Sequence, residues 1–392
     1  NFSKKFLDFI DNESLSYYPN EKNILNVIKN FNFSKVNREL LSKELEFQYK
    51  SLVTSSIVND NIKSIMSDNT FTVTTGHQLN IFTGPMYVIY KIVSVIKLSR
   101  MLSEKYPKYN FVPIYWMASE DHDFDEIKSF YSSGKTYSWD IESKGPVGNL
   151  NTEALKNIFD EDISIPDFFR EAYSSSSSLS EAVRKYMNHL FGEYGLITID
   201  PNSKNLKKSI SDIIVDDVVN NTIEKVEKSS EKISDVYVRK INFFFQGSDF
   251  RERIDKTNKY NILSTNLSFT EKEIKDKIGS SPELFSPNVI TRCLYQQRIL
   301  PNICYIGGPA EIVYWESFKK FFEYYDIPYP VLVPRDFVLL ITTKIQKLIN
   351  KLKLSLTDLF IDKNKIENKV LGIKKDESKN FKKEIDDINK IL

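Results

Sequence analysis

Cysteine is almost absent from this chain of 392 residues, which contains only Cys293 and Cys304. Two cysteines at this spacing form neither a disulfide framework nor a zinc-ligand pattern, so a disulfide-stapled secreted domain is excluded and a reducing, cytoplasmic location is favoured. We expect both cysteines to be small buried residues. Histidine and tryptophan are also scarce, with three of each, so the places where they stand are informative.

An excess of charge of one sign is missing as well. The 54 basic and 53 acidic residues leave a net charge of +1, which argues against a nucleic-acid partner because such proteins carry a basic surface. No uninterrupted apolar run is long enough to span a bilayer, and the first residues, which begin at Asn1 without an initiator Met, contain no signal peptide. We therefore expect a globular protein of two or three domains, with a trimmed start and no membrane partner.

The sequence is organised around residues 71–85, which read FTVTTGHQLNIFTGP. The β-branched and aromatic residues at 71–75 predict a strand. Thr83 is suited to cap the following helix, and Pro85 fits a first helical position, where its missing N–H does no harm. This pattern predicts a helix that starts at once, runs to about Lys105, and is apolar nearly all round and therefore buried.

A polar line interrupts that helix at Tyr87, Lys91 and Ser94, which are spaced i, i+4 and i+7. The start of a helix presents free N–H groups, and here a lysine and a histidine, Lys91 and His77, stand beside them. Such a combination suits an anion. We therefore expect phosphate or carboxylate oxygens to bind at this helix start.

Apolar strands alternate with helices along the rest of the chain. This alternation predicts an α/β fold, a doubly wound and mainly parallel sheet covered on both faces. The further core strands are expected at 111–118, 195–200, 302–306 and 330–335. Around them we expect a helical layer at 1–70, insertions at about 125–190 and 230–285, the second of antiparallel strands, a helix at about 205–228, and the start of a helical coiled-coil arm at 337–392.

Polar and glycine residues gather at the carboxyl ends of three strands, at 76–78, 120–123 and 307–309. Taken singly, each has a structural explanation: a tight turn, a solvated helix start and a simple helix cap. Ligands of open α/β sheets, however, bind beyond the carboxyl ends of the strands. Two of the three histidines, His77 and His122, lie at these ends, and Trp116 and Trp315 flank them, which favours a functional site.

The residue types at these ends suggest acid–base chemistry with an anionic ligand. An imidazole beside carboxylates can exchange a proton near neutral pH, and glycine-containing helix starts let backbone N–H groups approach phosphate closely. The chain has no Walker lysine motif and no Gly-x-Gly-x-x-Gly, which excludes standard P-loop and dinucleotide sites, and it has no His-Glu-x-x-His pair for zinc. His122 with Asp121 or Asp123 is an alternative set of metal ligands, but we favour an acid–base or hydrogen-bonding role for it and expect no metal centre.

Four segments resemble the bacillithiol-biosynthesis cysteine-adding enzymes: GHQLNIFTGPMYVIYK at 76–91, FVPIYWMASEDHD at 111–123, NVITRCLYQ at 288–296 and YIGGPAEIVYW at 305–315. The resemblance extends from about Phe71 to Arg335. It implies a Rossmann-like catalytic core at 71–336, insertions like the connecting peptides of class I aminoacyl-tRNA synthetases, and a coiled-coil arm for homodimerisation that is incomplete here. It also implies the last pathway step, a ligase reaction that joins L-cysteine to glucosaminyl malate through an amide. His77 stands where many relatives carry Gln.

Amide formation needs an activated carboxyl group, so ATP with Mg²⁺ is the expected energy source, and no tightly bound cofactor is expected. We hypothesise that His122, positioned by Asp121 or Asp123, takes a proton from the attacking amine. Arg292 or Arg335 would hold a malate carboxylate by a bidentate contact. The candidate catalytic residues are His122, Asp121, Asp123 and Glu120, and the candidate binding residues are Gly76, His77, Gln78, Thr83, Gly84, Tyr87, Lys91, Trp116, Arg292, Gln296, Gly307, Gly308, Glu311, Trp315 and Arg335.

Two other functions are compatible with the sequence. One is a synthetase-like or nucleotidyltransferase-like enzyme with another amine acceptor. The other is a non-enzymatic scaffold whose glycine loops only pack and whose coiled-coil arm recruits partners.

Overall fold

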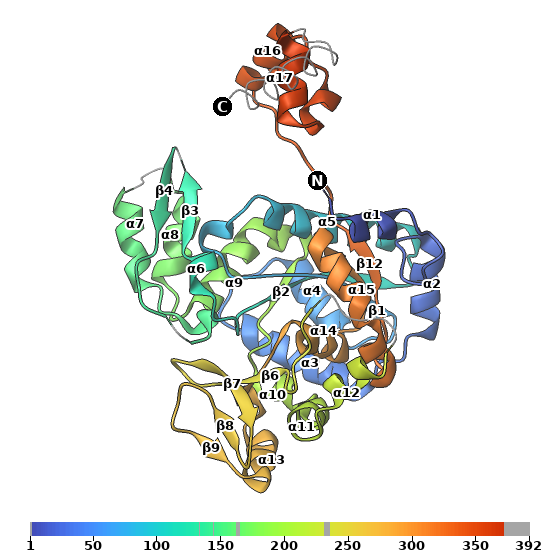
Figure 1. The fold of residues 1–392 in the computed structure, drawn as a ribbon, viewed down its shortest axis with the longest axis vertical. Coiled ribbons are helices and arrows are strands. Elements are labelled where there is room, and N and C mark those ends of the chain that lie inside the picture. The colour runs from blue at the N-terminus through green and yellow to red at the C-terminus, as the bar shows by residue number, and fades with distance from the viewer. Residues whose placement is uncertain (1, 133, 144, 162–164, 231–235, 372–392) are drawn as a thin grey trace, which may run out of the picture. The chain divides into compact units, whose positions relative to one another are not determined.

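The computed structural model describes residues 2–132, 134–143, 145–161, 165–230 and 236–371. The chain divides into two compact units, Asn1–Asp336 and Phe337–Leu392. All strands of the described residues belong to the larger unit, whose ribbon is drawn in Figure 1.

A five-stranded parallel sheet forms the centre of the larger unit. In spatial order its strands are β12 (Val331–Pro334), β11 (Asn302–Gly307), β1 (Thr70–His77), β2 (Asn110–Met117) and β5 (Ile197–Ile199). β1 pairs with β2 along its whole length and with β11 on its other side. Counted along the chain, this is the strand order of a Rossmann fold, with the order reversing between β1 and β11. The predicted α/β, Rossmann-like, parallel sheet is confirmed.

Helices cover both faces of this sheet because its strands bury side chains in both directions. In β2, Val112, Ile114 and Trp116 join one core cluster, and Tyr115 and Met117 join another on the opposite face. The first face packs against α1 (Lys4–Ile10), α3 (Lys35–Tyr49), α4 (Ser56–Ser64), α14 (Val289–Ile299) and α15 (Pro309–Tyr324). The second packs against α2 (Glu21–Asn30), α5 (Tyr87–Lys105) and α9 (Leu179–Phe191). The N-terminal helices therefore divide between the two faces.

Two insertions leave the sheet on different sides of the view in Figure 1, the first at the left and the second at the bottom. The first contains α6 (Phe124–Ile127), the hairpin of β3 (Ser129–Ser132) and β4 (Lys135–Ser138), α7 (Lys156–Glu161) and α8 (Asp167–Ser174). The second is an antiparallel sheet, as expected, with α13 (Glu271–Ser280) beside it. Its strands, in spatial order, are β10 (Phe285–Pro287), β6 (Phe243–Gln246), β7 (Arg251–Lys256), β8 (Tyr260–Ile262) and β9 (Ser268–Phe269).

The single helix expected at about 205–228 is wrong, because the segment forms three helices: α10 (Lys204–Lys208), α11 (Ser211–Asn220) and α12 (Thr222–Lys228). Asn221 takes the left-handed conformation with φ of 55° and ends α11. Asparagine tolerates this conformation better than most residues, and so it commonly ends helices.

The helix start expected at Thr83 and Pro85 is also wrong. The residues after β1 form a 3₁₀ turn, Ile81–Thr83, and α5 begins only at Tyr87, without a side-chain cap. Phe82 and Thr83 have positive φ angles of 53° and 69°, so Thr83 does not take the extended conformation of a typical N-cap residue. The ring of Phe82 lies against aromatic rings of the first insertion, and its N–H donates to the Tyr173 hydroxyl at 2.9 Å. These tertiary contacts outweigh the local capping signal.

The smaller unit contains α16 (Thr343–Lys351), a 3₁₀ turn at Leu356–Phe360 and α17 (Lys363–Leu371). Its apolar residues at helical spacing include Ile345 and Leu348, which are exposed. Residues 372–392 of the expected arm lie outside the described residues, so the coiled coil and the dimer stay predictions. No helix in the described part of the chain has the length and apolar character needed to cross a membrane.

The turn after β1 yields a stability prediction at Gly84, which has φ of +64°. A Cβ atom there would lie 2.4 Å from Asn80 Cβ, so both the backbone and the space oppose a side chain. We expect Gly84→Ala to lower the free energy of unfolding by at least about 2 kcal/mol in urea titrations. Gly279→Ala in α13 is the matched control, since no described heavy atom lies within 4 Å of its Cβ, and it should be neutral or stabilising by up to about 1 kcal/mol. Equal stability of the two variants would contradict this turn conformation.

Candidate active site

A cavity of about 870 Å³ lies at the carboxyl ends of β1, β2 and β11, where the strand order reverses. This switch point is where α/β sheets bind ligands, because the loops on its two sides leave toward opposite faces of the sheet. Residues of all three predicted strand ends line the cavity. Its lining is Gly76, His77, Gln78, Tyr87, Lys91, Trp116, Met117, Ala118, Ser119, Glu120, Asp121, Glu126, Pro201, Phe244, Arg251, Pro287, Asn288, Val289, Arg292, Tyr305, Gly308, Pro309, Ala310, Glu311, Tyr314 and Arg335.

Twelve of the predicted site residues are in this lining, and seven are not. Thr83 and Gly84 belong to the turn before α5, and Asp123 is exposed at the start of α6. Gln296 and Trp315 are buried behind the wall. The Gln296 side-chain oxygen accepts a hydrogen bond from Arg292 Nη1 at 3.2 Å, and the ring of Trp315 stacks on that of Tyr305 with their centroids 4.3 Å apart. The other two are Gly307, whose carbonyl accepts from the Arg335 N–H at 2.9 Å, and His122, which is treated below.

A buried ion pair joins the loops on the two sides of the switch point. Lys91 Nζ lies 2.5 Å from Glu311 Oε2 and donates to the Gly76 carbonyl at 2.9 Å. Glu311 also accepts from the Gly308 N–H at 2.7 Å and the Tyr305 hydroxyl at 2.8 Å. Burial alone would raise the pKa of Glu311, but Lys91 and these donors hold it below its ordinary value. The amino group of Lys91 and the N–H of Gly308, both expected to bind anions, are therefore engaged by Glu311.

Two arginines supply positive charge to the same cavity. Arg292 Nη2 lies 3.4 Å from the Tyr314 hydroxyl, and its guanidinium lies beside Gly76 of β1, where a Cβ atom would be 3.4 Å from Arg292 Nη1. The Arg335 guanidinium lies 5.5 Å from the ring centroid of Tyr87. Guanidinium groups match the planar geometry of carboxylate and phosphate oxygens.

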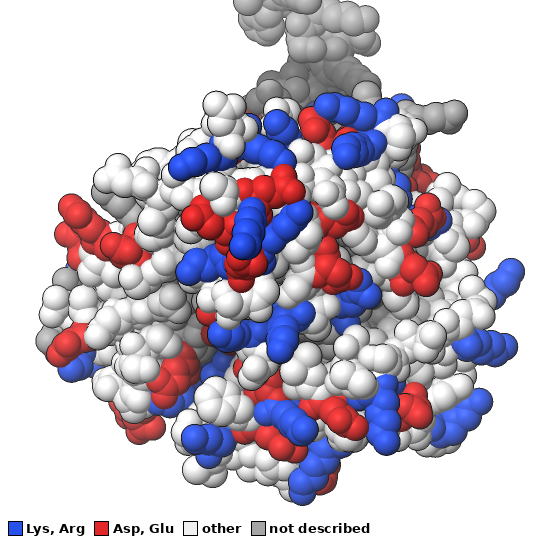
Figure 2. Space-filling model, turned by 90° about the horizontal axis from the view of Figure 1, so that it is seen from below, with Lys and Arg blue, Asp and Glu red and all other residues white. Residues whose placement is uncertain are grey.

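The positive charge of the cavity does not come from a basic surface. Over the described residues of the face shown in Figure 2, Lys and Arg side chains are interleaved with Asp and Glu. This agrees with the near-zero net charge of the chain. The arginines of the cavity wall are therefore not part of an extended basic surface on this face.

His77 is the polar residue of the wall with the clearest unmet bonding capacity. Its Nε2 is buried and has no hydrogen-bond partner among the described residues. Burial, followed by the positive charge of Lys91, lowers the pKa of His77 to about 4, with Glu311 acting in the opposite direction. The imidazole is therefore neutral at pH 7, so it can offer a ligand a hydrogen bond but no positive charge.

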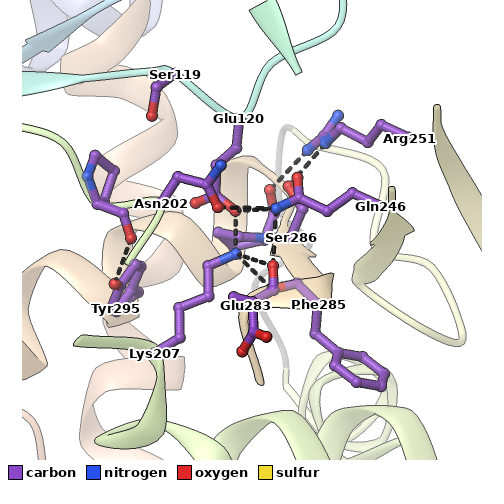
Figure 3. A network of polar contacts seen from close by, with 12 residues as sticks. Ser119, Glu120, Asn202, Lys207, Gln246, Arg251, Glu283, Phe285, Ser286 and Tyr295 are labelled. Atoms are coloured by element: carbon purple, nitrogen blue, oxygen red, sulfur yellow. Dashed lines mark hydrogen bonds and ion pairs between the residues drawn. The ribbon is translucent and has the colours of Figure 1, made fainter. Parts of the chain in front are cut away.

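Glu120 is tied to the second insertion by a buried network, drawn in Figure 3. Its carboxylate forms an ion pair with Lys207 of α10, which also donates to the carbonyls of Phe285 at 2.9 Å and Glu283 at 3.3 Å. Gln246 of β6 donates to the Glu283 carbonyl at 2.8 Å as well. Burial raises the pKa of Glu120 and lowers that of Lys207, so burial opposes the charged pair and the hydrogen bonds stabilise it.

Asp121, His122 and Arg251 form the acidic end of the cavity. Asp121 Oδ1 accepts from the His122 backbone N–H at 2.8 Å, and its Oδ2 accepts from Gln78 Nε2 at 2.9 Å, which joins the loops after β1 and β2. Although burial opposes it, hydrogen bonds from His122 and Gln78 and the charge of Arg251 lower the pKa of Asp121 below its ordinary value. The carboxylate is therefore ionised at neutral pH and is suited to bind an ammonium group.

The His122 ring contacts Arg251, which the sequence did not suggest, as well as Asp121, one of the two orienting partners that it did suggest. Its Nδ1 lies 2.9 Å from Arg251 Nη1 and 3.6 Å from Asp121 Oδ1. Asp123 is exposed, and no contact between it and the His122 ring is present among the described residues. His122 itself is 43% exposed beside the cavity. Whether it accepts a proton during catalysis stays a prediction.

Sequence reasoning missed several residues of the wall. Tyr305 and Tyr314 stood inside the motif at 305–315, so a signal for them was present. No signal in the sequence pointed to Arg251. Both Arg251 and Arg253 lie on β7, and only the structure shows that Arg251 is buried and Arg253 is exposed. The two cysteines are buried, as predicted. No group of three or more His, Cys, Asp or Glu residues able to hold a metal ion occurs in the described part of the chain.

Fold and site together define a class: a Rossmann-like α/β protein with a small-molecule cavity at its switch point, walled by two arginines and an acidic loop. The family model described as "Bacillithiol biosynthesis BshC, N-terminal Rossmann-like domain" matches residues 10–336. The chain belongs to the BshC family of bacillithiol biosynthesis. The resemblance in the sequence motifs is thereby confirmed.

Several relatives carry the name "Putative cysteine ligase BshC". The chain is 40% identical to that of Flavobacterium johnsoniae, over 94% of its own length and 74% of the relative's. It is 41% identical to that of Flavobacterium psychrophilum, over 92% and 72% of the two lengths. Identity to that of Cytophaga hutchinsonii is 38%, again over 92% and 72%. These names confirm the expected enzyme class, a ligase.

The network of Figure 3 predicts a large stability cost for Lys207→Met. This change leaves Glu120 buried without its cation and removes a donor from the carbonyls of Phe285 and Glu283, so we expect a loss of about 3–5 kcal/mol in the free energy of unfolding. Lys208→Met is the matched control, since Lys208 is exposed on the same helix, and it should stay within about 0.5 kcal/mol of the parent. Urea titrations of both variants check the prediction, and a Lys207 variant as stable as the control would contradict the network.

The pKa of His77 predicts a pH dependence of stability. The folded value of about 4 lies below the ordinary 6.5, so the folded chain binds fewer protons than the unfolded chain between these values. Stability should therefore fall as pH drops from 6.5 to 4, by on the order of 3 kcal/mol from this group.

The comparison with His77→Gln isolates this contribution, because glutamine does not titrate. The free energy of unfolding of the parent minus that of the variant should be constant above pH 6.5 and should decrease as the pH falls toward 4. Asp217, whose pKa burial raises to about 7, has the opposite slope but is common to both proteins. Parallel curves would show that His77 is not held neutral by its surroundings.

Proposed function

We propose that this chain catalyses the addition of L-cysteine to the amine of glucosaminyl malate, forming an amide bond. Membership of the BshC family and the name of its relatives support this proposal. The observation that carries it is the pairing, within one cavity, of Arg292 and Arg335 with the ionised Asp121. One end suits the carboxylates of malate, and the other suits the α-ammonium group of an amino acid.

The groups that remain available for hydrogen bonding suggest how the substrates lie. A malate carboxylate bound by Arg292 would lie near the buried Nε2 of His77, which has no partner among the described residues. The ammonium group of cysteine would bind Asp121. This arrangement directs the cysteine carboxyl group to the middle of the cavity, where the sugar amine must attack it.

The cysteine carboxylate is too unreactive to be attacked directly, so the proposal includes its activation by ATP. The carboxylate would displace pyrophosphate from the α-phosphate, and the amine would then displace AMP and lose a proton. Arg335 and His77 are the side chains of the wall that fit a phosphate oxygen, because Glu311 engages Lys91 and Gly308. Mg²⁺ would arrive with the nucleotide, whose phosphates supply the oxygen ligands that it prefers.

The remaining partners belong to the same proposal. Homodimerisation would involve the arm at 337–392, and a cytoplasmic location would supply ATP and reduced cysteine. An enzyme with another amine acceptor is the second candidate function, because Arg292 and Arg335 would hold other carboxylates equally well.

Reconstitution with the purified chain tests the proposal. Cysteine, glucosaminyl malate, ATP and Mg²⁺ are combined and the thiol product is measured by mass spectrometry, with ATP or Mg²⁺ omitted in parallel. We expect product only in the complete mixture. Amide formation with another amine but not with glucosaminyl malate would support the second candidate instead.

A pair of variants links the activity to the cavity. Arg292→Met removes a guanidinium from the wall and should raise KM for glucosaminyl malate at least about tenfold. Arg298→Met is the matched control on the same helix, since Arg298 pairs with Asp212 outside the cavity, and it should leave KM unchanged. Equal KM values would remove Arg292 from malate binding.

A further inference from the structure

The second insertion places one arginine, Arg251 of β7, against the acidic loop. The guanidinium group is only 7% exposed and is held from several sides. Its Nε donates to Ser286 Oγ at 2.8 Å, as Figure 3 shows, and its Nη2 donates to the Pro287 carbonyl at 2.8 Å. The guanidinium carbon lies 3.9 Å from the ring centroid of Phe244. These contacts leave Nη1 pointing in one fixed direction.

That direction is toward the imidazole of His122, whose Nδ1 lies 2.9 Å from Arg251 Nη1. A guanidinium group has only donors, so Nδ1 must accept this hydrogen bond. A neutral imidazole has a single N–H, which is then on Nε2. Asp121 Oδ1, at 3.6 Å from the same Nδ1, would favour the other tautomer, in which Nδ1 donates to the carboxylate. Arg251 and Asp121 thus compete for Nδ1, and the shorter contact is the one to Arg251.

We propose that Arg251 is a positioning residue that holds neutral His122 with its proton on Nε2, so that His122 donates a hydrogen bond to the reacting substrate and does not take a proton from the amine. The acceptor is the carbonyl oxygen of the activated acyl group, which gains negative charge as the amine attacks. The hydrogen bond from His122 to the substrate rests on the proposed function. The tautomer rests only on the contacts of His122 and Arg251.

The tautomer can be measured in the full chain by the ¹⁵N chemical shifts of the histidine rings. The chain has only three histidines, so His122→Gln assigns the signals. At a pH where the ring is neutral, we expect the proton on Nε2. Arg251→Met should move it to Nδ1, since Asp121 is then the remaining charged group in contact with the ring. Arg253→Met, an exposed change on the same strand, should leave the tautomer unchanged.

A proton on Nδ1 in the parent chain would overturn the proposal, whether or not the Arg251 variant folds. An unchanged tautomer in a folded Arg251→Met variant would overturn the role of Arg251. Because this measurement needs no substrate, it stands even if the reconstituted reaction fails.

Measurements of kcat distinguish whether His122 donates a hydrogen bond or accepts a proton. A glutamine amide can donate a hydrogen bond but cannot take a proton, so we expect His122→Gln to keep kcat within about tenfold of the parent. His122→Ala should lose at least about a hundredfold, as expected for a missing donor to a developing oxyanion. Equal, large losses in both variants would make His122 a proton acceptor and contradict the proposal.

Discussion

The buried ion pair between Lys91 and Glu311 holds together the part of the molecule on which the site depends. Lys91 lies on the helix that follows β1, and Glu311 lies in the first turn of the helix that follows β11. These strands are neighbours at the one place where the strand order of the sheet reverses. Loops diverge at such a place, and the ion pair, with its bond to the Gly76 carbonyl, links them across the opening. The cavity keeps its shape because this charge pair is part of its wall.

Because of this ion pair, the contacts of the polar residues around the cavity differ from those that the sequence suggests. A lysine beside a helix start suggests anion binding, but Lys91 already has an anion within its own chain. The other positive charges of the cavity wall belong to Arg292 and Arg335, and the buried Nε2 of the neutral His77 has no hydrogen-bond partner among the described residues. The ion pair is thus part of the wall itself, and the proposed ligand binding involves the arginines and the imidazole.

The second insertion is part of the site and not an appendage to it. Its β6, β7 and β10 contribute Gln246, Arg251 and Ser286, which join the acidic loop through Glu120 and His122. The core alone would leave the carboxylate of Glu120 without Gln246 and the imidazole of His122 without Arg251. A Rossmann-like core with this acidic loop therefore needs the insertion to set the direction of its polar groups.

Much of the fold could be predicted because its signals are local. The β-branched run at 71–75 acts on neighbouring residues, and the strand formed where expected. The two failures had different causes: a contact with a distant segment in one, and a residue in the left-handed conformation in the other. Phe82 packs into the first insertion and displaces the helix start from Thr83, and Asn221 breaks a segment whose composition suits one helix.

By itself, the sequence determined the alternation of strands and helices, the family through four motifs, and the three strand ends from which a site would be built. Only the tertiary structure decided that β1 lies beside β11, that Glu311 neutralises Lys91, and that Arg251 of the two arginines on β7 faces His122. The reason is physical. Strand and helix formation depends on residues a few positions apart, whereas the protonation and the partners of a buried polar group depend on charges that folding brings from distant parts of the chain.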